Sequence, residues 1–129
     1  MSLRTTYPNV PCNAARPSRP YDQAVIIRVL TASVRLDQAP RLHALMREQL
    51  PIMHEHDGLV YTKLARRLDG DMEQVILFEE WRDPRALYAW VGSNLDRARL
   101  QPGAAELIDA LVVTHYEALD IVEDVPLID

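Results

Sequence analysis

Hydrophobic and polar residues alternate along this chain with two different periods, and the two periods predict its secondary structure. Apolar residues that are β-branched or spaced by two indicate four strands, at residues 24–34, 59–68, 75–81 and 112–119. Apolar residues spaced by three and four indicate three helices, the first between Asp37 and Gly58 and the others at 83–92 and 104–110. The chain is therefore expected to run strand, helix, strand, strand, helices and a final strand.

Local signals mark the ends of these elements. Asp83 stands where a helix N-cap belongs, and Pro84 follows at the first helical position, where its missing N–H is no loss. Gly58 suits the left-handed position after the first helix, and Pro51 is expected to kink or break that helix. Residues 69–71, Asp-Gly-Asp, predict a tight hairpin between the second and third strands.

The order β-α-β-β-α-β with a central hairpin predicts an α+β, ferredoxin-like antiparallel sheet with its helices on one face. Strand alternation separates two sets of side chains. We expect the mostly apolar set to face the helices: Val25, Ile27, Val29, Ile76, Phe78, Val112, Thr114, Tyr116 and Ala118. The opposite set mixes charges with apolar groups: Ile26, Arg28, Leu30, Tyr61, Lys63, Leu77, Glu79, His115 and Glu117. Such a mixture suits a subunit interface, so we expect a homodimer joined sheet to sheet.

Length and composition narrow the class of protein. With 129 residues the chain is expected to form one domain, residues 23–120, preceded by a proline-rich arm at 1–22 and followed by a tail at 121–129. A net charge of −5 argues against partners such as nucleic acid or an anionic membrane. The single cysteine, Cys12, excludes an internal disulfide. We expect a soluble, cytoplasmic domain.

Three segments carry a resemblance to a known family. They are HDGLV at 56–60, VILFEEW at 75–81 and DPRALYAWVGS at 83–93. With them, residues 24–120 resemble the antibiotic-biosynthesis-monooxygenase domains, which are small dimeric α/β-barrel proteins. The resemblance implies a cavity between sheet and helices in each subunit. It also implies a cofactor-independent monooxygenase, an oxidoreductase without metal or organic cofactor, that acts on an aromatic polyketide or a quinol-type small molecule.

Another branch of that family degrades haem with an asparagine on the first strand and a tryptophan and histidine on the helical segment. Trp90 matches the tryptophan, whereas the histidine position falls at Leu100. The asparagine position falls among Ile27, Arg28 and Val29. Two of the three residues are missing, so haem degradation by that mechanism is disfavoured.

The expected pocket is built around the two tryptophans, one at a strand end and one on the covering helix. We expect Trp81 and Trp90 to wall it, Tyr116 to hydrogen-bond the substrate oxygen and His56 to act as the base. Five further substrate-binding residues are expected: Thr62, Thr114, Phe78, Met46 and Met53. The plainer interpretation is that these residues are core side chains or bond nearby backbone.

The remaining histidines are given structural roles. His54 and His56 are two apart, unlike the i, i+4 pair of a zinc helix, so no metal site is expected. His43 is expected to be exposed, and His115 to form an interface ion pair near Glu117. Two other functions stay open. One is a non-catalytic dimeric module that binds a small apolar ligand, with haem as one candidate, and the other is a purely structural dimer.

Overall fold

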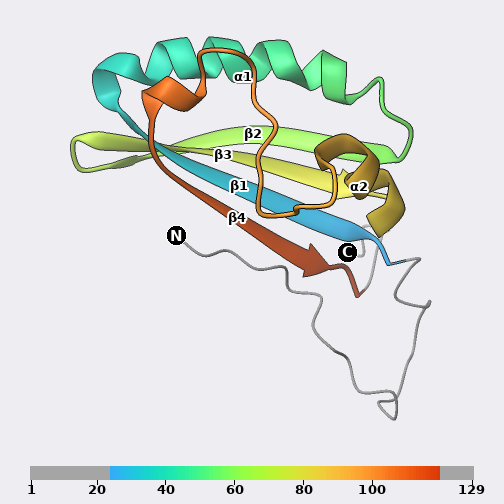
Figure 1. Cartoon of the computed structure of the whole chain (residues 1–129). Coiled ribbons are helices and arrows are strands. Elements are labelled where there is room, and N and C mark those ends of the chain that lie inside the picture. The colour runs from blue at the N-terminus through green and yellow to red at the C-terminus, as the bar shows by residue number, and fades with distance from the viewer. Residues whose placement is uncertain (1–23, 120–129) are drawn as a thin grey trace, which may run out of the picture.

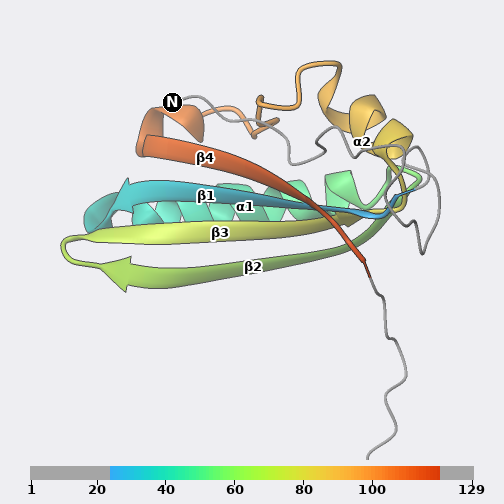
Figure 2. The same ribbon diagram turned by 90° about the horizontal axis from the view of Figure 1, so that it is seen from below.

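A computed structural model of the chain describes residues 24–119, and the expected arm at 1–22 and tail at 121–129 lie outside this range. Four antiparallel strands form one sheet in the order β2-β3-β1-β4 (Figure 1). The strands are β1 (Ile26–Arg35), β2 (Leu59–Asp69), β3 (Met72–Trp81) and β4 (Ile108–Glu117). The helices α1 (Ala39–Met53) and α2 (Pro84–Val91) lie on the same side of this sheet, and residues 24–119 leave the opposite side open (Figure 2). This arrangement is the expected ferredoxin-like fold.

Local chemistry explains why α2 begins and ends where it does. The side chain of Asp83 accepts a 2.8 Å hydrogen bond from the backbone N–H of Ala86, and Pro84 occupies the first helical position, as the sequence predicts. Gly92 ends the helix with a φ of 86°. Together these caps fix the direction of a short helix whose buried face carries Leu87 and Trp90.

The first helix buries one stripe of side chains with the three- and four-residue spacing that predicted it. The side chains that α1 buries against the sheet are those of Ala39, Leu42, Met46, Gln49 and Met53. Pro51 lies in the last turn, and the helix ends two residues later at Met53. Gly58, with a φ of 99°, follows the turn after α1; a Cβ at this position would lie 2.3 Å from that of Ala86. The turn after α1 therefore packs closely against α2 only because residue 58 is glycine.

The last helical prediction is wrong. Residues 104–110 were expected to form a helix, but only the 3-10 turn η3 (Ala105–Leu107) precedes β4, which begins at Ile108. Pairing of Ile108 with Val34 of β1 overrides the helical propensity of this alanine-rich segment. Residues 92–104, between α2 and η3, contain no helix or strand and cross the helix-covered side of the sheet (Figure 1).

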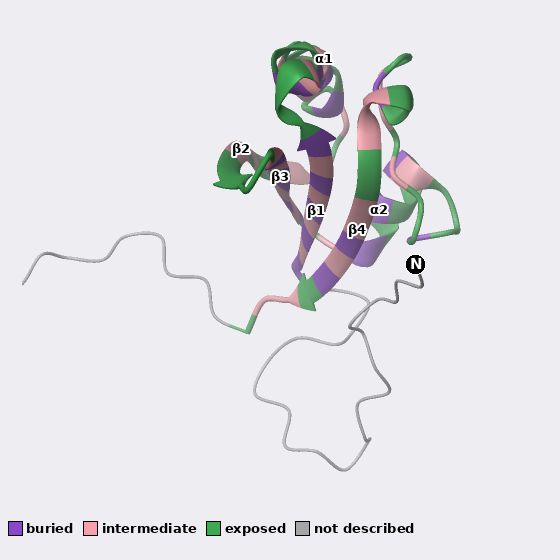
Figure 3. Cartoon of the chain, turned by 90° about the vertical axis from the view of Figure 1, so that its left-hand side faces the viewer, coloured by how far each residue is buried: buried purple, intermediate pink, exposed green. Residues whose placement is uncertain are grey.

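The two faces of the sheet are the reverse of those predicted. Ile26, Leu30 and Val34 of the central strand are buried under the helices, whereas Ile27 and Val29 on the open face are half-buried (Figure 3). The prediction failed because β1 carries large apolar groups at both parities, so alternation alone does not show which set meets the helices.

A bulge in β2 adds a further change. Leu59 pairs with Trp81 but Tyr61 pairs with Glu80, so the alternation shifts by one residue at Val60. Tyr61 and Lys63 consequently face the open side, while Thr62 and Leu64 face the helices. The bulge therefore separates Tyr61 and Lys63 from the charged residues with which the sequence grouped them.

Candidate functional site

A row of polar residues crosses the helix-covered face of the sheet. One residue from each strand contributes, and neighbouring residues are paired directly: Thr62 with Glu79, Glu79 with Arg28, and Arg28 with His115. Trp81 and Ile26 flank the row on one side, where Glu117 of β4 continues their row, and Leu77, Leu30 and Val113 flank it on the other. We call Thr62, Glu79, Arg28 and His115 the polar row. Its last three members are at most 1% exposed.

Arg28 occupies the centre of the polar row and makes most of its contacts. Its Nη1 donates to the carbonyl of Leu95 at 3.1 Å and to Nε2 of His115 at 3.1 Å, and its Nη2 donates to the carbonyl of Arg97. Its Nε lies 3.7 Å from Oε1 of Glu79. Because a guanidinium only donates, His115 must accept through an unprotonated Nε2. Arg28 thus holds the irregular segment 92–104 against the sheet.

Burial shifts the proton affinities of both of the titratable neighbours of Arg28. Desolvation raises the pKa of Glu79 to about 7, although the charge of Arg28 and a 2.8 Å hydrogen bond from Nε1 of Trp81 oppose that rise. Desolvation and then the positive charge of Arg28 lower the pKa of His115 to about 4. At neutral pH, Glu79 therefore lies near its titration midpoint, and His115, on the other side of Arg28, is neutral. A buried carboxyl poised in this way is typical of sites that transfer protons.

Two stacked indoles border the polar row. The rings of Trp81 and Trp90 lie with centroids 6.4 Å apart and an interplanar angle of 26°. The imidazole of His56 meets Trp90 edge-on at 4.7 Å, and Cζ of Arg99 lies 4.1 Å from the centroid of the same indole. Trp90 is therefore held between a histidine and a guanidinium while it stacks on Trp81.

The structure separates the expected site residues into two groups. Those on the helix-covered side are Trp81, Trp90, Thr62, Met46, Met53 and, half-buried at the turn after α1, His56. Tyr116, Thr114 and Phe78 lie on the open face, because they pair with Ile27 and Val29 of β1. The expectation that Tyr116 and Thr114 face the helices is wrong. Tyr116 is 50% exposed and cannot share a pocket with the two tryptophans.

Sequence reasoning also misplaced two of the histidines. His115 is fully buried beside Arg28 and not at an exposed interface, and His43 is half-buried and bonded to Glu73. His54 bonds Oγ1 of Thr62 at 2.8 Å, which ties the end of α1 to the polar row. Arg28 and Glu79 were missed as site residues because single charges inside strands resemble solvent-facing positions. The direct cross-strand pairing of Arg28 with both Glu79 and His115 is the signal that sequence alone does not contain.

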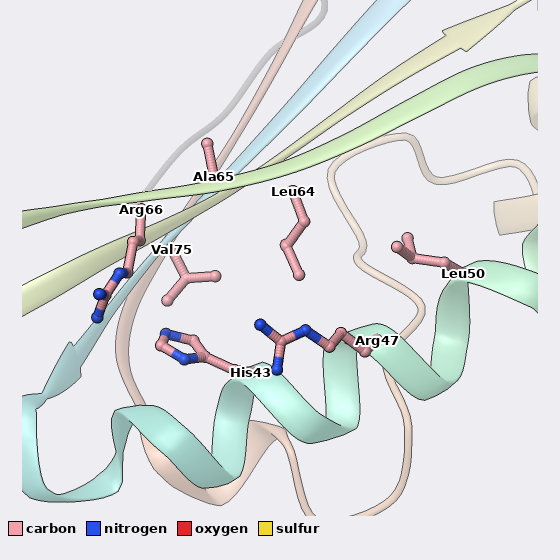
Figure 4. Close-up of a pocket in the computed structure, with 7 residues that line it drawn as sticks. All are labelled: His43, Arg47, Leu50, Leu64, Ala65, Arg66 and Val75. Carbon is pink, nitrogen blue, oxygen red and sulfur yellow. The ribbon is translucent and has the colours of Figure 1, made fainter.

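Two of the solvent-open hollows in the described part of the chain bear on ligand binding. A groove of about 440 Å³ lies between α1 and β2, and it is lined by His43, Arg47, Leu50, Leu64, Ala65, Arg66 and Val75 (Figure 4). A smaller hollow of about 300 Å³ on the open face is lined by Ile27, Tyr61, Lys63, Phe78, Glu79 and Glu80. Within residues 24–119, no three His, Cys, Asp or Glu side chains gather as metal ligands would. Neither helix there has the length and apolar character needed to cross a membrane.

The polar row predicts how stability depends on pH. Unfolding returns Glu79 from a pKa of about 7 to about 4.5, so its contribution to stability is present at low pH and is lost as pH rises towards 7. Unfolding returns His115 from about 4 to about 6.5, so its contribution is present at high pH and is lost as pH falls towards 4. Between pH 4.5 and 6.5 the two effects oppose each other.

Single variants are expected to separate the two opposed dependences of stability on pH. Relative to wild type, the stability of Glu79→Gln should rise with pH between 4.5 and 7, and that of His115→Gln should fall with pH between 4 and 6.5. Each slope is limited to about 1.4 kcal/mol per pH unit. Urea unfolding at pH 4, 5, 6 and 7 measures both variants against wild type. Two relative slopes of the same sign would contradict the assignment.

Comparison with known proteins supports the fold. No protein-family model matches the chain, and no protein of curated function matches its sequence. Among solved structures, Rv0793 from Mycobacterium tuberculosis superposes with a TM-score of 0.62 at 23% identity, over 78% of this chain and 100% of that one. SnoaB from Streptomyces nogalater is described as a cofactor-independent oxygenase. It superposes with a TM-score of 0.60 at 16% identity, over 78% of this chain and 99% of that one. A candidate antibiotic biosynthesis monooxygenase from Deinococcus radiodurans gives 0.58 at 17% identity over 78% and 99%. The resemblance seen in the sequence is therefore confirmed in the fold: the chain has the ferredoxin-like subunit fold of the antibiotic-biosynthesis-monooxygenase structures.

Proposed function

We propose that this protein is a cofactor-independent monooxygenase that acts on an aromatic polyketide or a quinol-type small molecule. The observation that carries the proposal is Glu79, a buried carboxyl with a pKa of about 7 that lies beside Arg28 and is bonded to one of two stacked indoles. The likeness to SnoaB supports it, since that protein has the same subunit fold and is described as a cofactor-independent oxygenase.

The polar row supplies what such a reaction asks of a protein. A phenol or quinol becomes reactive towards O₂ when it loses a proton, and the substrate itself provides the electrons. Glu79 is the proposed base, because a carboxyl with a pKa near the working pH accepts protons effectively. The guanidinium of Arg28 would stabilise the phenolate that forms next to it. The rings of Trp81 and Trp90 offer a flat surface for an aromatic substrate.

Entry of a substrate requires movement of the layer above the polar row, because Glu79 is 1% exposed. Segment 92–104 covers this region without regular secondary structure, and the carbonyls of Leu95 and Arg97 tie it to Arg28. A few hydrogen bonds open at lower free-energy cost than a helix or strand that must unfold. We propose that the substrate enters beneath this segment, with Thr62, Met46 and Met53 on the walls.

The site differs from the one expected from sequence in its catalytic residues. His56 packs against Trp90 and is proposed to position that ring, so Glu79 takes over the role of base. Tyr116, Thr114 and Phe78 are not part of the proposed site, because they lie on the opposite face of the sheet.

Oxygen consumption tests this proposal directly. The full chain, treated with a chelator and dialysed, is incubated with a panel of anthrones and quinols while dissolved oxygen is followed with an electrode. At least one substrate is expected to consume oxygen faster than in buffer alone, and the chelator is expected not to change the rate. Rates equal to the uncatalysed background across the panel would contradict the oxygenase function.

Binding of a ligand without turnover is the alternative function. The residues present do not suit haem as that ligand. Leu100 occupies the position of the histidine that the haem-degrading branch of the resembling family uses. The inward-facing His115 accepts from Arg28 through Nε2, so that nitrogen is not available to iron. Haem is therefore not part of the proposal. Protection of an aromatic substrate without oxygen uptake would favour a binding module.

We also propose that two copies pair through their open faces. Half-buried Ile27, Val29, Ile76, Phe78 and Val112 form the apolar centre of this face, whose cross-strand pairs also include Thr31, Thr114 and Glu80. Tyr61 and Tyr116 flank this centre and are 42% and 50% exposed. Contiguous apolar surface with aromatic residues at its edge is typical of a subunit interface.

Sedimentation equilibrium is expected to give twice the chain mass of 14.7 kDa at micromolar concentration. Phe78→Arg should yield a monomer, because it places a charge at the centre of the apolar surface. Leu68→Arg is the matched control, since Leu68 is 68% exposed at the hairpin end of β2, away from that centre. A monomeric wild type, or a dimer that survives Phe78→Arg, would contradict sheet-to-sheet pairing.

A further inference from the structure

We propose that the groove between α1 and β2 is a separate binding site for a small amphipathic carboxylate, that is, an apolar body with one anionic group. His43, Arg47 and Leu50 approach from α1, while Leu64, Arg66 and Val75 approach from β2 and β3. Figure 4 shows Leu64 and Val75 pointing from the sheet towards α1, His43 and Arg47 pointing from α1 towards the sheet, and Ala65 pointing away. A volume of about 440 Å³ suits a ligand of one or two rings.

One side of the groove is organised by a buried carboxylate. Glu73 is 1% exposed, and its two oxygens contact Nε2 of His43 and, at 3.2 Å, Nη1 of Arg66. These contacts join α1 to the β2–β3 hairpin and orient two basic side chains at the groove. Ordering them in advance lowers the entropy lost when a ligand binds.

Arg47 supplies the charge that a ligand would meet. Arg66 is paired with Glu73, whereas Arg47 forms no ion pair with an acidic side chain among residues 24–119. The two guanidiniums carry two positive charges against the single negative charge of Glu73. The groove is therefore locally positive in a protein whose net charge is −5. A carboxylate matches the planar fork of an arginine with two parallel hydrogen bonds.

The apolar part of the groove selects the rest of the ligand. Leu50, Leu64 and Val75 form its inner wall, and Leu64 and Val75 face α1 from neighbouring strands. An apolar body against these side chains leaves its acidic end at Arg47. A cation would be repelled, and an inorganic anion would leave the apolar wall in water.

Calorimetric titration with 2-naphthoate, and with 2-naphthamide as its neutral counterpart, tests this site on the full chain. Wild type is expected to bind the acid saturably and the amide at least tenfold more weakly. Arg47→Gln should weaken the binding of the acid at least tenfold and leave the binding of the amide unchanged. Arg41→Gln is the matched control, because Arg41 is an exposed arginine on α1 that does not line the groove.

The location of binding is checked by amide chemical shifts, which are expected to change at residues 43–50, 64–66 and 75. Glu79→Gln should bind naphthoate as wild type does, because Glu79 does not line the groove. The test of the groove is therefore independent of the oxygenase proposal. Three results would overturn the proposed groove site: no saturable binding of naphthoate, equal losses of naphthoate affinity in Arg47→Gln and Arg41→Gln, or chemical-shift changes confined to the open face of the sheet.

Discussion

Replacement of Arg28 by methionine is expected to lower the free energy of unfolding by about 4 kcal/mol, because it removes the shared partner of several buried groups. The guanidinium donates to the carbonyls of Leu95 and Arg97 and to Nε2 of His115, and it lies 3.7 Å from the carboxyl of Glu79. Methionine fills much of the same space but donates nothing. The variant therefore retains the desolvation cost of these groups without their compensating interactions.

Urea unfolding at pH 7 measures this loss, and Arg35→Met provides its control on the same strand. Arg35 pairs with Asp37 at 3.4 Å, and the two side chains are 59% and 70% exposed. An exposed pair of this kind contributes at most about 1 kcal/mol. Similar losses in the two variants would show that the contacts of Arg28 add nothing beyond those of a surface arginine.

The second large effect concerns catalysis, and it rests on the proposed oxygenase function. Glu79→Gln is expected to lower kcat by about 10²- to 10⁴-fold, the range typical for loss of a general base. Glutamine keeps the shape of the side chain and an oxygen that can accept from Nε1 of Trp81. The variant should therefore fold while it loses the group that takes the substrate proton.

The pH dependence of the rate separates this role from a structural one. A base works in its deprotonated form, so the wild-type rate should rise with pH through about 7, the pKa of Glu79, and then level off. The variant should lose that rise. Glu48→Gln, at an exposed position on α1, is expected to keep both rate and profile. An unchanged profile in Glu79→Gln would exclude this carboxyl as the base.

The structure of the site accounts for what sequence reasoning missed. Trp81 and Trp90 were expected to share one wall, and they stack at 6.4 Å, because a strand end and the helix that follows it must lie close together. Arg28, Glu79 and His115 were assigned to an interface because charges within strands usually face away from a core. They are tolerated inside because each is paired across neighbouring strands, a relationship that depends on register.

The sequence by itself determined the features that depend on near neighbours in the chain. They include the β-α-β-β-α-β order, the Asp83 cap, the hairpin at 69–71 and the buried stripe of α1, since each reflects local backbone preference or helical spacing. Only the tertiary structure decided which strand face meets the helices, where the bulge at Val60 shifts the alternation and how residues 104–110 divide between a turn and β4. These outcomes depend on strand pairing between segments far apart in sequence, and the polar row exists only once four such strands are aligned.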